Sequence, residues 1–468
     1  MKLSNNYQWN IAHLSERLRV KESFDIIERH LDTAGGELTL FYIDGFVKDG
    51  EMQRMMQYLL TAKSISGAGQ MVRRLPYMEV ELASDVDKMV CAVLSGQSLM
   101  LAESFADEAV LIDMRTYPAR NTAEPDSDRV MQGSHDGFVE TLVMNTALIR
   151  RRIRDERLTM EHINIGGSSK TDIVLCYMSG VADEKIVKEV RKKLKEAMPK
   201  SLTLGFQSLA ESVIKRGWLN PFPKIRTTER PDTAAAQLIE GSVLVICDTS
   251  PQVMILPTSI FDYLQQTDDY YFPPLTGSYM RIIRTLILLL SAVATPLWYM
   301  CIYYSEYLPE SLRFLLPESP GALPILLQLI LVELAIDGLK IASMNTPDML
   351  SNSLSVVGAL ILGDFAIEVG WLCADVIFYM AFVAIANFAQ QNHELGYAIK
   401  FIRVLTLILV ALLGVWGFAA GIIFSVFLVV TNKTLFGRGY LYPLIPFNAR
   451  ALGRLFFRVK KTDFSKKS

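Results

Sequence analysis

Hydrophobic stretches with few charges are confined to the C-terminal part of the chain. Charged residues recur steadily through residues 1–284, and five hydrophobic segments follow. These segments cover residues 285–305, 322–342, 353–372, 374–391 and 404–431. A helix of about 20 apolar residues is long enough to cross the hydrocarbon core of a bilayer. The pattern predicts a soluble region of about 280 residues, followed by an α-helical transmembrane domain over residues 285–432.

The weakest of the five segments is residues 322–342. Glu333, Asp337 and Lys340 lie close to one face of its second half, and charged side chains are costly inside a bilayer. We therefore expect a bundle of about four spans, with residues 322–342 forming a re-entrant or partly inserted segment.

The polar half of the chain alternates strand and helix patterns. Residues 37–46 read as a strand ending in an Asp-Gly turn, and Asp49 is expected to cap a helix with apolar residues at helical spacing. A helix over 84–94 and strands at 98–102 and 109–114 complete a small cytosolic α/β domain over residues 20–117. The polar, proline-containing residues 118–129 read as a linker.

A second cytosolic α/β domain is expected over residues 130–258. It begins with a long amphipathic helix over 137–154, and strands at 173–178 and 243–246 bracket further helices at 183–198, 209–216 and 233–239. Residues 166–171 read as a hairpin loop. Residues 259–284 carry several Phe and Tyr side chains just before the first span, which predicts an amphipathic collar on the membrane surface.

Charge is distributed unevenly along the chain. The net charge is −2, yet residues 433–468 contain nine Lys or Arg against the single Asp463. The loop after the first span is acidic, so the positive-inside rule puts the N-terminal domains and the basic tail, 433–468, in the cytosol, with an even number of crossings. Lys400 and Arg403 before the last segment point the other way, and the basic tail is given more weight.

The composition excludes several classes of protein. With 51% hydrophobic residues, 21% charged residues and a mean hydropathy of +0.25, the chain is neither disordered nor collagen-like. Its five cysteines are scattered singly and no His lies at ligand spacing, so neither a disulfide framework nor a metal site is expected. No catalytic triad or glycine-rich nucleotide motif stands out. We therefore expect that the protein is not an enzyme, binds no cofactor and has no nucleic-acid partner.

The third hydrophobic segment carries the most informative pattern. At helical spacing, one stripe consists of the small residues Ala359, Gly363, Ala366 and Gly370. A second stripe consists of Val357, Ile361, Asp364 and Glu368. Small residues allow close helix packing, and intramembrane carboxylates are functional by default. In a ring of identical helices the second stripe would line a pore, with a hydrophobic gate beside an acidic vestibule. The alternative is that its carboxylates lie at the membrane interface or pair with a basic group.

Two motifs in the second α/β domain allow more than one interpretation. Ser134 or Asp136 could cap a helix, or the loop around them could bind an anion through backbone N–H groups. The triplet of arginines at 150–152 is a solvated helix face or pairs between subunits with carboxylates such as Glu229 or Asp232. The candidate residues for an oligomer interface are Arg150, Arg151, Arg152, Glu229, Arg230 and Asp232.

Several motifs together resemble a known family. They include Asp136-Gly137-Phe138-Val139-Glu140, the run Ala147–Ile153, Ser169-Lys170-Thr171 and Thr228-Glu229-Arg230-Pro231-Asp232, with Gly363-Asp364 and Tyr440-Leu441-Tyr442-Pro443-Leu444 in the membrane half. In their order and spacing they resemble the A subunits of the GerA-type spore germination receptors, and most of all their SpoVAF-like branch. This chain has Ser134-His135 where the family commonly has Pro-Arg.

The resemblance implies a multi-pass protein of the spore inner membrane with both termini on the cytosolic, spore-core side. It implies a ring-shaped homo-oligomer, most simply a pentamer, that releases monovalent cations during germination. Partners would be the permease-like B and lipoprotein C subunits, or a small accessory membrane protein. The alternatives are a non-conducting receptor or scaffold subunit that transmits a germinant signal, and a secondary transporter.

Overall fold

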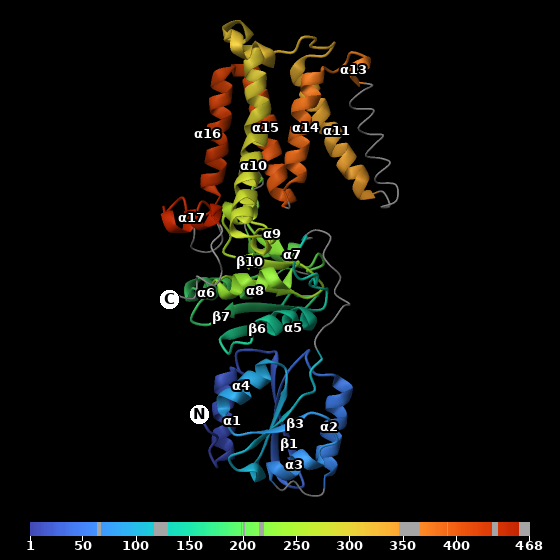
Figure 1. The fold of residues 1–468 in the computed structure, drawn as a ribbon, viewed down its shortest axis with the longest axis vertical. Helices are drawn as coiled ribbons and strands as arrows, with labels where there is room; N and C mark the ends of the chain where they lie inside the picture. The colour runs from blue at the N-terminus through green and yellow to red at the C-terminus, as the bar shows by residue number, and fades with distance from the viewer. Residues whose placement is uncertain are drawn as a thin grey trace. The chain divides into compact units, whose positions relative to one another are not determined.

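The chain forms an α/β unit and a helical unit (Figure 1). The structure, a computed structural model, describes residues 1–62, 67–116, 130–197, 199, 202–214, 220–345, 366–390, 392–432 and 439–457. The α/β unit comprises Met1–Arg216, Ile225–Thr258 and Leu435–Arg438, and the helical unit comprises Gly217–Lys224, Ser259–Thr434 and Gly439–Ser468.

The α/β unit contains two domains, each built on one antiparallel sheet. The first contains α1 (Tyr7–Leu18), β1 (Ile26–Thr33), β2 (Gly36–Ile43), α2 (Asp49–Thr61), α3 (Ala68–Arg74), β3 (Val80–Ala83), α4 (Val86–Leu94), β4 (Ser98–Ala102), a 3-10 turn (Glu103–Phe105) and β5 (Ala109–Ile112). The second contains α5 (Leu142–Arg152), β6 (Leu158–Ile165), β7 (Thr171–Met178), α6 (Glu184–Glu196), α7 (Phe206–Val213), β8 (Arg226–Thr228), α8 (Pro231–Ile239), β9 (Val243–Cys247) and β10 (Val253–Leu256).

The two domains repeat one topology. Within the described residues, the strand order is β1-β2-β4-β5-β3 in the first sheet and β6-β7-β9-β10-β8 in the second. The order of elements along the chain is also the same in both. Each sheet is covered on both faces, by α1 and α4 against α2 and α3 in the first domain, and by α6 and α7 against α5 and α8 in the second. The expected pair of α/β domains is therefore present in the described structure.

Several local predictions need correction. The predicted helix 137–154 is shorter, because α5 begins only at Leu142, whose N–H donates to Asp248 Oδ1 at 3.0 Å. Asp49 lies in the first turn of α2, and Lys48 is its N-cap. The loop predicted at 166–171 does join two strands, β6 and β7, as a hairpin. Strands β1, β3, β8 and β10 were not predicted, and β6 was implied by the hairpin without bounds.

The helical unit begins with short turns and continues into long helices. Its elements are two 3-10 or short helices at Ile260–Leu264 and α9 (Asp268–Tyr271), then α10 (Pro274–Tyr303), 3-10 turns at Ser305–Tyr307 and Glu310–Leu315, α11 (Ile325–Asn345), α13 (Ala366–Glu368), α14 (Ala374–Phe388), α15 (His393–Leu413), α16 (Val415–Thr431) and α17 (Ala449–Phe456). Of the described helices, α10 and α15 are long and apolar enough to cross a membrane, and α14 and α16 are shorter apolar helices.

The prediction of one span at 404–431 is wrong, because the chain turns within that segment. α15 ends at Leu413, Gly414 adopts φ 58°, and α16 starts at Val415 and runs beside α15 (Figure 1). Glycines allow the two helices to approach closely: a Cβ atom on Gly417 would lie 1.9 Å from the Leu409 carbonyl oxygen. A positive φ is a conformation that glycine adopts at little cost, so Gly414 is the residue that permits the turn.

The sequence predicted a re-entrant or partly inserted segment at 322–342, and residues 325–345 form one continuous helix, α11, that does not turn back on itself. At 1.5 Å per residue, a helix of 21 residues is about 30 Å long. The charged residues that made this segment a poor candidate for a membrane span, Glu333, Asp337 and Lys340, have partners on α15.

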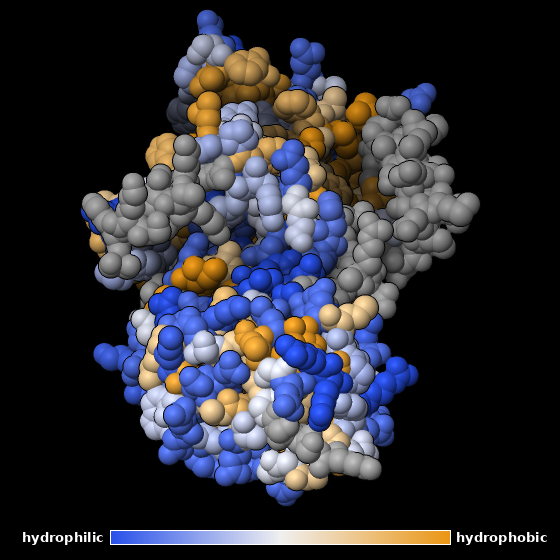
Figure 2. Space-filling view, turned by 60° about the horizontal axis from the view of Figure 1, so that its bottom comes forward, coloured by the Kyte–Doolittle hydropathy of each residue, from blue (hydrophilic) through white to orange (hydrophobic). Residues whose placement is uncertain are grey.

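The chain enters and leaves the helical unit at the same end. The N–H of Ile260, before α10, donates to the carbonyl of Tyr440, after α16, at 2.9 Å. On α10, exposed apolar side chains follow one stripe from Leu275 through Tyr279 and Ile282 to Leu289. Figure 2 shows that hydrophobic residues gather on the helices of this unit, whereas the surface of the α/β unit is mostly hydrophilic. Such exposed apolar surface is typical of a lipid-facing or protein-binding face.

Candidate functional site

The helical unit buries a ladder of opposite charges between α11 and α15. Arg403 Nη2 lies 2.6 Å from Glu333 Oε1, and Arg403 Nη1 donates to the Ser291 carbonyl of α10 at 3.1 Å. One turn further along, Lys400 pairs with Asp337 and lies 3.7 Å from Glu333. The spacing of these residues explains why both pairs form. Glu333 and Asp337 are four positions apart and share one face of α11, and Lys400 and Arg403 are three positions apart and share the facing side of α15.

Lys340 forms the last rung of this charge ladder. Its Nζ lies 3.4 Å from His393 Nδ1, at the start of α15, and 5.1 Å from the centre of the Tyr397 ring. This rung has an imidazole and an aromatic face where the others have carboxylates. A cation over an aromatic ring is attracted by the ring quadrupole. The ladder therefore ends on a weaker contact than those at Glu333 and Asp337.

The pairing of opposite charges determines whether the ladder stabilises the bundle. In the first two rungs Glu333 and Asp337 meet Arg403 and Lys400, so these pairs cancel in net charge. Removing one partner would leave a buried charge uncompensated. Paired charges inside a helical bundle mark a functional position or fix the register of the helices. In this protein the ladder holds α11, α15 and the middle of α10 together.

A second buried cluster lies at the start of α10. Asp269 of α9 is completely buried and accepts from Arg281 Nε at 3.2 Å and from Arg284 Nη2 at 3.0 Å. Arg284 also donates to the Leu264 carbonyl and to Gln266. Both arginines thus point away from the exposed apolar stripe of α10. Residues 274–284 of the predicted collar, 259–284, are the first turns of α10, and Asp269 ties the preceding residues to them.

Most of the predicted pore stripe lies outside the described residues. This applies to Val357, Ile361 and Asp364 of the gate and vestibule, and to Ala359 and Gly363 of the small-residue stripe. Glu368 is described and is exposed at the end of α13. Ala366 begins α13, but the helix ends at Glu368 and Gly370 adopts φ 76°. Gly370 therefore does not continue a helical stripe with Ala366, because the chain turns there.

The candidate interface arginines have different surroundings. Arg150 has no exposed surface, and its Nε and Nη2 donate to the two carboxylate oxygens of Asp25 at 2.8 and 3.1 Å. This ion pair joins α5 to the first domain, so the charge of Arg150 is already paired within the chain and is not available to a second subunit. Arg151, its neighbour, is exposed on α5.

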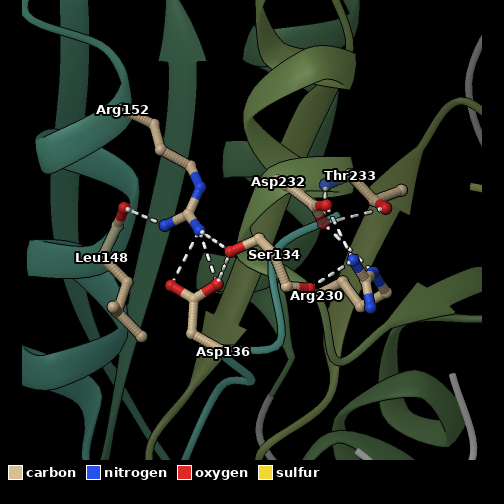
Figure 3. A network of polar contacts seen from close by, with 7 residues as sticks. All are labelled: Ser134, Asp136, Leu148, Arg152, Arg230, Asp232 and Thr233. Carbon is tan, nitrogen blue, oxygen red and sulfur yellow. Dashed lines mark hydrogen bonds and ion pairs between the residues drawn. The ribbon is translucent and has the colours of Figure 1, made fainter. Parts of the chain in front are cut away.

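Arg152 and Arg230 form an internal network through Ser134 (Figure 3). Arg152 Nη2 contacts both oxygens of Asp136 at 2.6 and 2.7 Å and Ser134 Oγ at 3.0 Å. Arg230, fully buried, donates to the Ser134 carbonyl at 2.8 Å and to Asp232 at 2.8 and 3.1 Å. The network joins the residues before α5 to the start of α8.

This network corrects two sequence interpretations. Ser134 and Asp136 do not cap a helix, because α5 begins at Leu142, and Asp136 pairs with Arg152 instead. Arg230 and Asp232 pair with each other rather than presenting free charges at the surface. Glu229 is partly buried and accepts from Gln252 Nε2 at 3.0 Å.

Burial and hydrogen bonding act in opposite directions on Asp136. Burial, the largest contribution, would raise the pKa of this carboxyl group, but the hydrogen bonds from Arg152 and Ser134 outweigh it and hold the pKa below its usual value. Asp136 is therefore held as a carboxylate, and its charge is matched within the domain.

Sequence reasoning missed the partners of these charges. It treated Glu333, Asp337 and Lys340 as an obstacle to membrane insertion and did not connect them with Lys400 and Arg403. The available signal was the spacing of opposite charges in two apolar segments. Asp25 carried no signal, since it lies 125 residues from Arg150.

In the part of the chain that the structure describes, no group of three His, Cys, Asp or Glu side chains could hold a metal ion.

Comparison with known proteins agrees with the motifs. The family model described as "Bacillus/Clostridium GerA spore germination protein" matches residues 13–468. Stage V sporulation protein AF of Bacillus subtilis (strain 168) is 35% identical over 466 residues, covering 98% of this chain and 94% of that protein. Spore germination protein KA of the same organism is 29% identical over 462 residues, covering 96% and 84%.

One solved structure is also similar. The crystal structure of the N-terminal domain of the A subunit of the Bacillus megaterium spore germinant receptor GerK3 is 25% identical, covers 55% of this chain and 96% of that chain, and has a TM-score of 0.38. The family match over nearly the whole chain, together with the stage V sporulation protein AF relative, confirms the resemblance drawn from the motifs. The chain belongs to the Bacillus/Clostridium GerA spore germination protein family.

Proposed function

We propose that this protein assembles into a ring-shaped oligomer in the spore inner membrane and conducts monovalent cations during germination. The observation that carries the proposal is a contrast between acidic side chains of the helical unit. Glu333 and Asp337 are paired with cations of α15, whereas Glu368 is exposed on the single chain. In a ring of identical chains, exposed carboxylates near the axis would raise the local concentration of cations.

The pore would be lined by the stripe that ends at Glu368. Val357 and Ile361 would form the hydrophobic gate, and Asp364 and Glu368 the acidic vestibule. The charge ladder between α11 and α15 would hold the helices that precede and follow this segment in a constant register. Family membership supports a role in spore germination. The partners of this proposal are permease-like and lipoprotein subunits or a small accessory membrane protein.

Cation efflux from liposomes tests the proposal directly. Purified protein is reconstituted with potassium inside and no added substrate gradient. Val357→Ala should increase leak because it widens the gate, whereas Asp364→Asn and Glu368→Gln should lower conductance. Glu306→Gln, an exposed carboxylate after α10, is the matched control and should behave as the parent protein.

The outcome also separates the alternatives. If Val357→Ala, Asp364→Asn and Glu368→Gln all behave as the control, the segment does not line a pore. If assembled rings conduct no cations at all, the non-conducting receptor or scaffold function is favoured. Flux that requires a gradient of a small solute would indicate a secondary transporter.

The orientation of the termini is tested separately. The hydrogen bond between Ile260 and Tyr440 supports an even number of crossings, because it joins the residues on either side of the long helices. The charge pattern of the sequence makes this the cytosolic side. Cysteines introduced at Ser4 and Ser468 should react with a membrane-impermeant reagent only from that side. Reaction of the two positions from opposite sides would require an odd number.

A further inference from the structure

The segment after α16 exposes large apolar side chains next to a cation. Phe447 is 70% exposed and Phe457 is 62% exposed, and Leu444 and Ile445 are also exposed. Between them lies the short helix α17, on which Arg450 is exposed. This segment belongs to the stretch that the sequence predicted only as a basic cytosolic tail. A tail that is surrounded only by water would not be expected to expose several large apolar side chains.

This segment is attached to the start of α10. Arg281 Nη1 donates to the Leu455 carbonyl of α17 at 3.3 Å, and Tyr440, at the start of the segment, accepts from the Ile260 N–H. Figure 1 shows α17, in red, running across the foot of α16 rather than along it. The helix is therefore held transverse to the long helices at the end where the chain enters the helical unit.

The neighbouring surface of α10 is apolar at this level. Tyr279 and Ile282 flank Arg281 in sequence and are exposed, and Arg281 itself is buried against Asp269. The apolar stripe of α10 thus extends to the height at which α17 is attached. A transverse helix at this height, with apolar residues around a cation, has the pattern of a helix lying in a membrane interface.

Charge identifies the surface that α17 would meet. Besides Arg450, the sequence from 454 to 468 contains Arg454, Arg458 and four lysines, against Asp463 alone. Clusters of Lys and Arg beside a membrane helix attract anionic lipid headgroups, while the long side chains of such cations can lie over apolar surface. A basic protein partner is disfavoured by the same charges.

We infer that α17 lies in the plane of the membrane on an anionic lipid surface. Ile445, Phe447 and Phe457 would insert among the acyl chains, and Arg450 would contact the headgroups. The inference rests on the membrane placement of the helical unit but not on cation conduction.

Collision accessibility of spin labels tests the inference in the full-length protein. The accessible Cys91 and Cys301 are replaced by Ser, and single cysteines are introduced as Phe447→Cys, Phe457→Cys and Arg450→Cys. Each labelled protein is placed in nanodiscs of phosphatidylglycerol or of phosphatidylcholine. Leu289→Cys on the apolar stripe of α10 is the lipid-exposed control, and Met78→Cys on the α/β unit is the water-exposed control.

The expected result is that labels at 447 and 457 collide more with oxygen than with a water-soluble nickel chelate, as at Leu289→Cys, while the label at 450 shows the reverse. Adding Arg450→Gln should reduce the depth of the label at 447 in phosphatidylglycerol but leave it unchanged in phosphatidylcholine. Labels at 447 and 457 that behave as at Met78→Cys would overturn the inference, as would low collision with both reagents, which indicates burial against protein. Equal depth in both lipids, with no effect of Arg450→Gln, would refute the headgroup contact. A nickel-accessible label at Leu289→Cys would instead refute the membrane placement itself.

Discussion

Arg403 of α15 places Nη2 2.6 Å from Glu333 Oε1 of α11, and both side chains are buried. The two residues are 70 positions apart in the sequence, and Arg403 also reaches the Ser291 carbonyl of α10. One arginine thus connects three helices of the unit. A charge in this position is tolerated only because its partner is present.

Removing one member of this pair should be strongly destabilising. We expect Glu333→Gln to lower the free energy of unfolding by about 3–5 kcal/mol, because it leaves Arg403 buried without a counter-charge. Exchanging the two charges, with Glu333→Arg and Arg403→Glu together, should recover part of the loss. Denaturation of the purified protein in detergent measures both, with Glu306→Gln as an exposed control. A cost of Glu333→Gln no larger than that of the control would show that the pair does not hold α11 and α15 together.

Neighbouring arginines of α5 should respond differently to the same change. Arg150→Met should lower the free energy of unfolding by about 3 kcal/mol or more, since it leaves the buried Asp25 carboxylate without a counter-charge. Arg151→Met, one position along the same helix but exposed, should stay within about 0.5 kcal/mol of the parent protein. Unfolding of the two variants in urea makes the comparison. Equal effects would contradict the burial of Arg150.

This difference also decides how an oligomer interface on α5 can be tested. A triple charge reversal at 150–152 would break the ion pairs of Arg150 and Arg152 within the chain, so loss of the oligomer would be ambiguous. Arg151→Glu alone leaves those pairs intact, and size measurement of that variant is the informative experiment.

The pairing of Asp136 with Arg152 should make stability depend on pH in the acid range. The pKa of Asp136 is held below its ordinary value of 3.8 in the folded protein. Its contribution is therefore complete above pH 3.8 and is lost as the pH falls from there through the lower folded value. The stability difference between the parent protein and Asp136→Asn should shrink over that window. Glu189→Gln, at an exposed helical pair, should show no comparable trend, and a difference that grows on acidification would contradict the ion pair.

Close packing of α15 and α16 should make one glycine intolerant of alanine. A Cβ atom on Gly417 would lie 1.9 Å from the Leu409 carbonyl oxygen, so Gly417→Ala must push the helices apart. Gly338→Ala on α11 is the matched control, because no atom lies within 4 Å of its added Cβ and alanine is about 1 kcal/mol better than glycine in a helix. Thermal unfolding in detergent should show Gly417→Ala below and Gly338→Ala at or above the parent protein. Similar behaviour of the two variants would contradict the tight contact.

Elements with strong local patterns were predictable. The helix predicted at 84–94 is α4, Val86–Leu94, because its apolar residues recur at helical spacing and pack on one sheet face. Strand β3, Val80–Ala83, was missed because it is only four residues long and lies at the edge of the sheet, where Glu81 and Leu82 are exposed and only Ala83 is buried. The turn at Gly414 was missed because the hydrophobic run continues through it, and a single glycine within an apolar segment does not by itself indicate a break.

The division into a polar α/β part and an apolar helical part can be read from the amino-acid sequence, since burial in protein or lipid requires runs and periodicities that are local along the chain. It also carried the motifs that identify the family. Which charges meet depends on the folded arrangement of the helices and strands. Glu333 with Arg403, Asp337 with Lys400 and Asp25 with Arg150 are separated by 70, 63 and 125 residues. An electrostatic partner is chosen by distance in space, and no local pattern records which distant element the fold will bring within 3 Å.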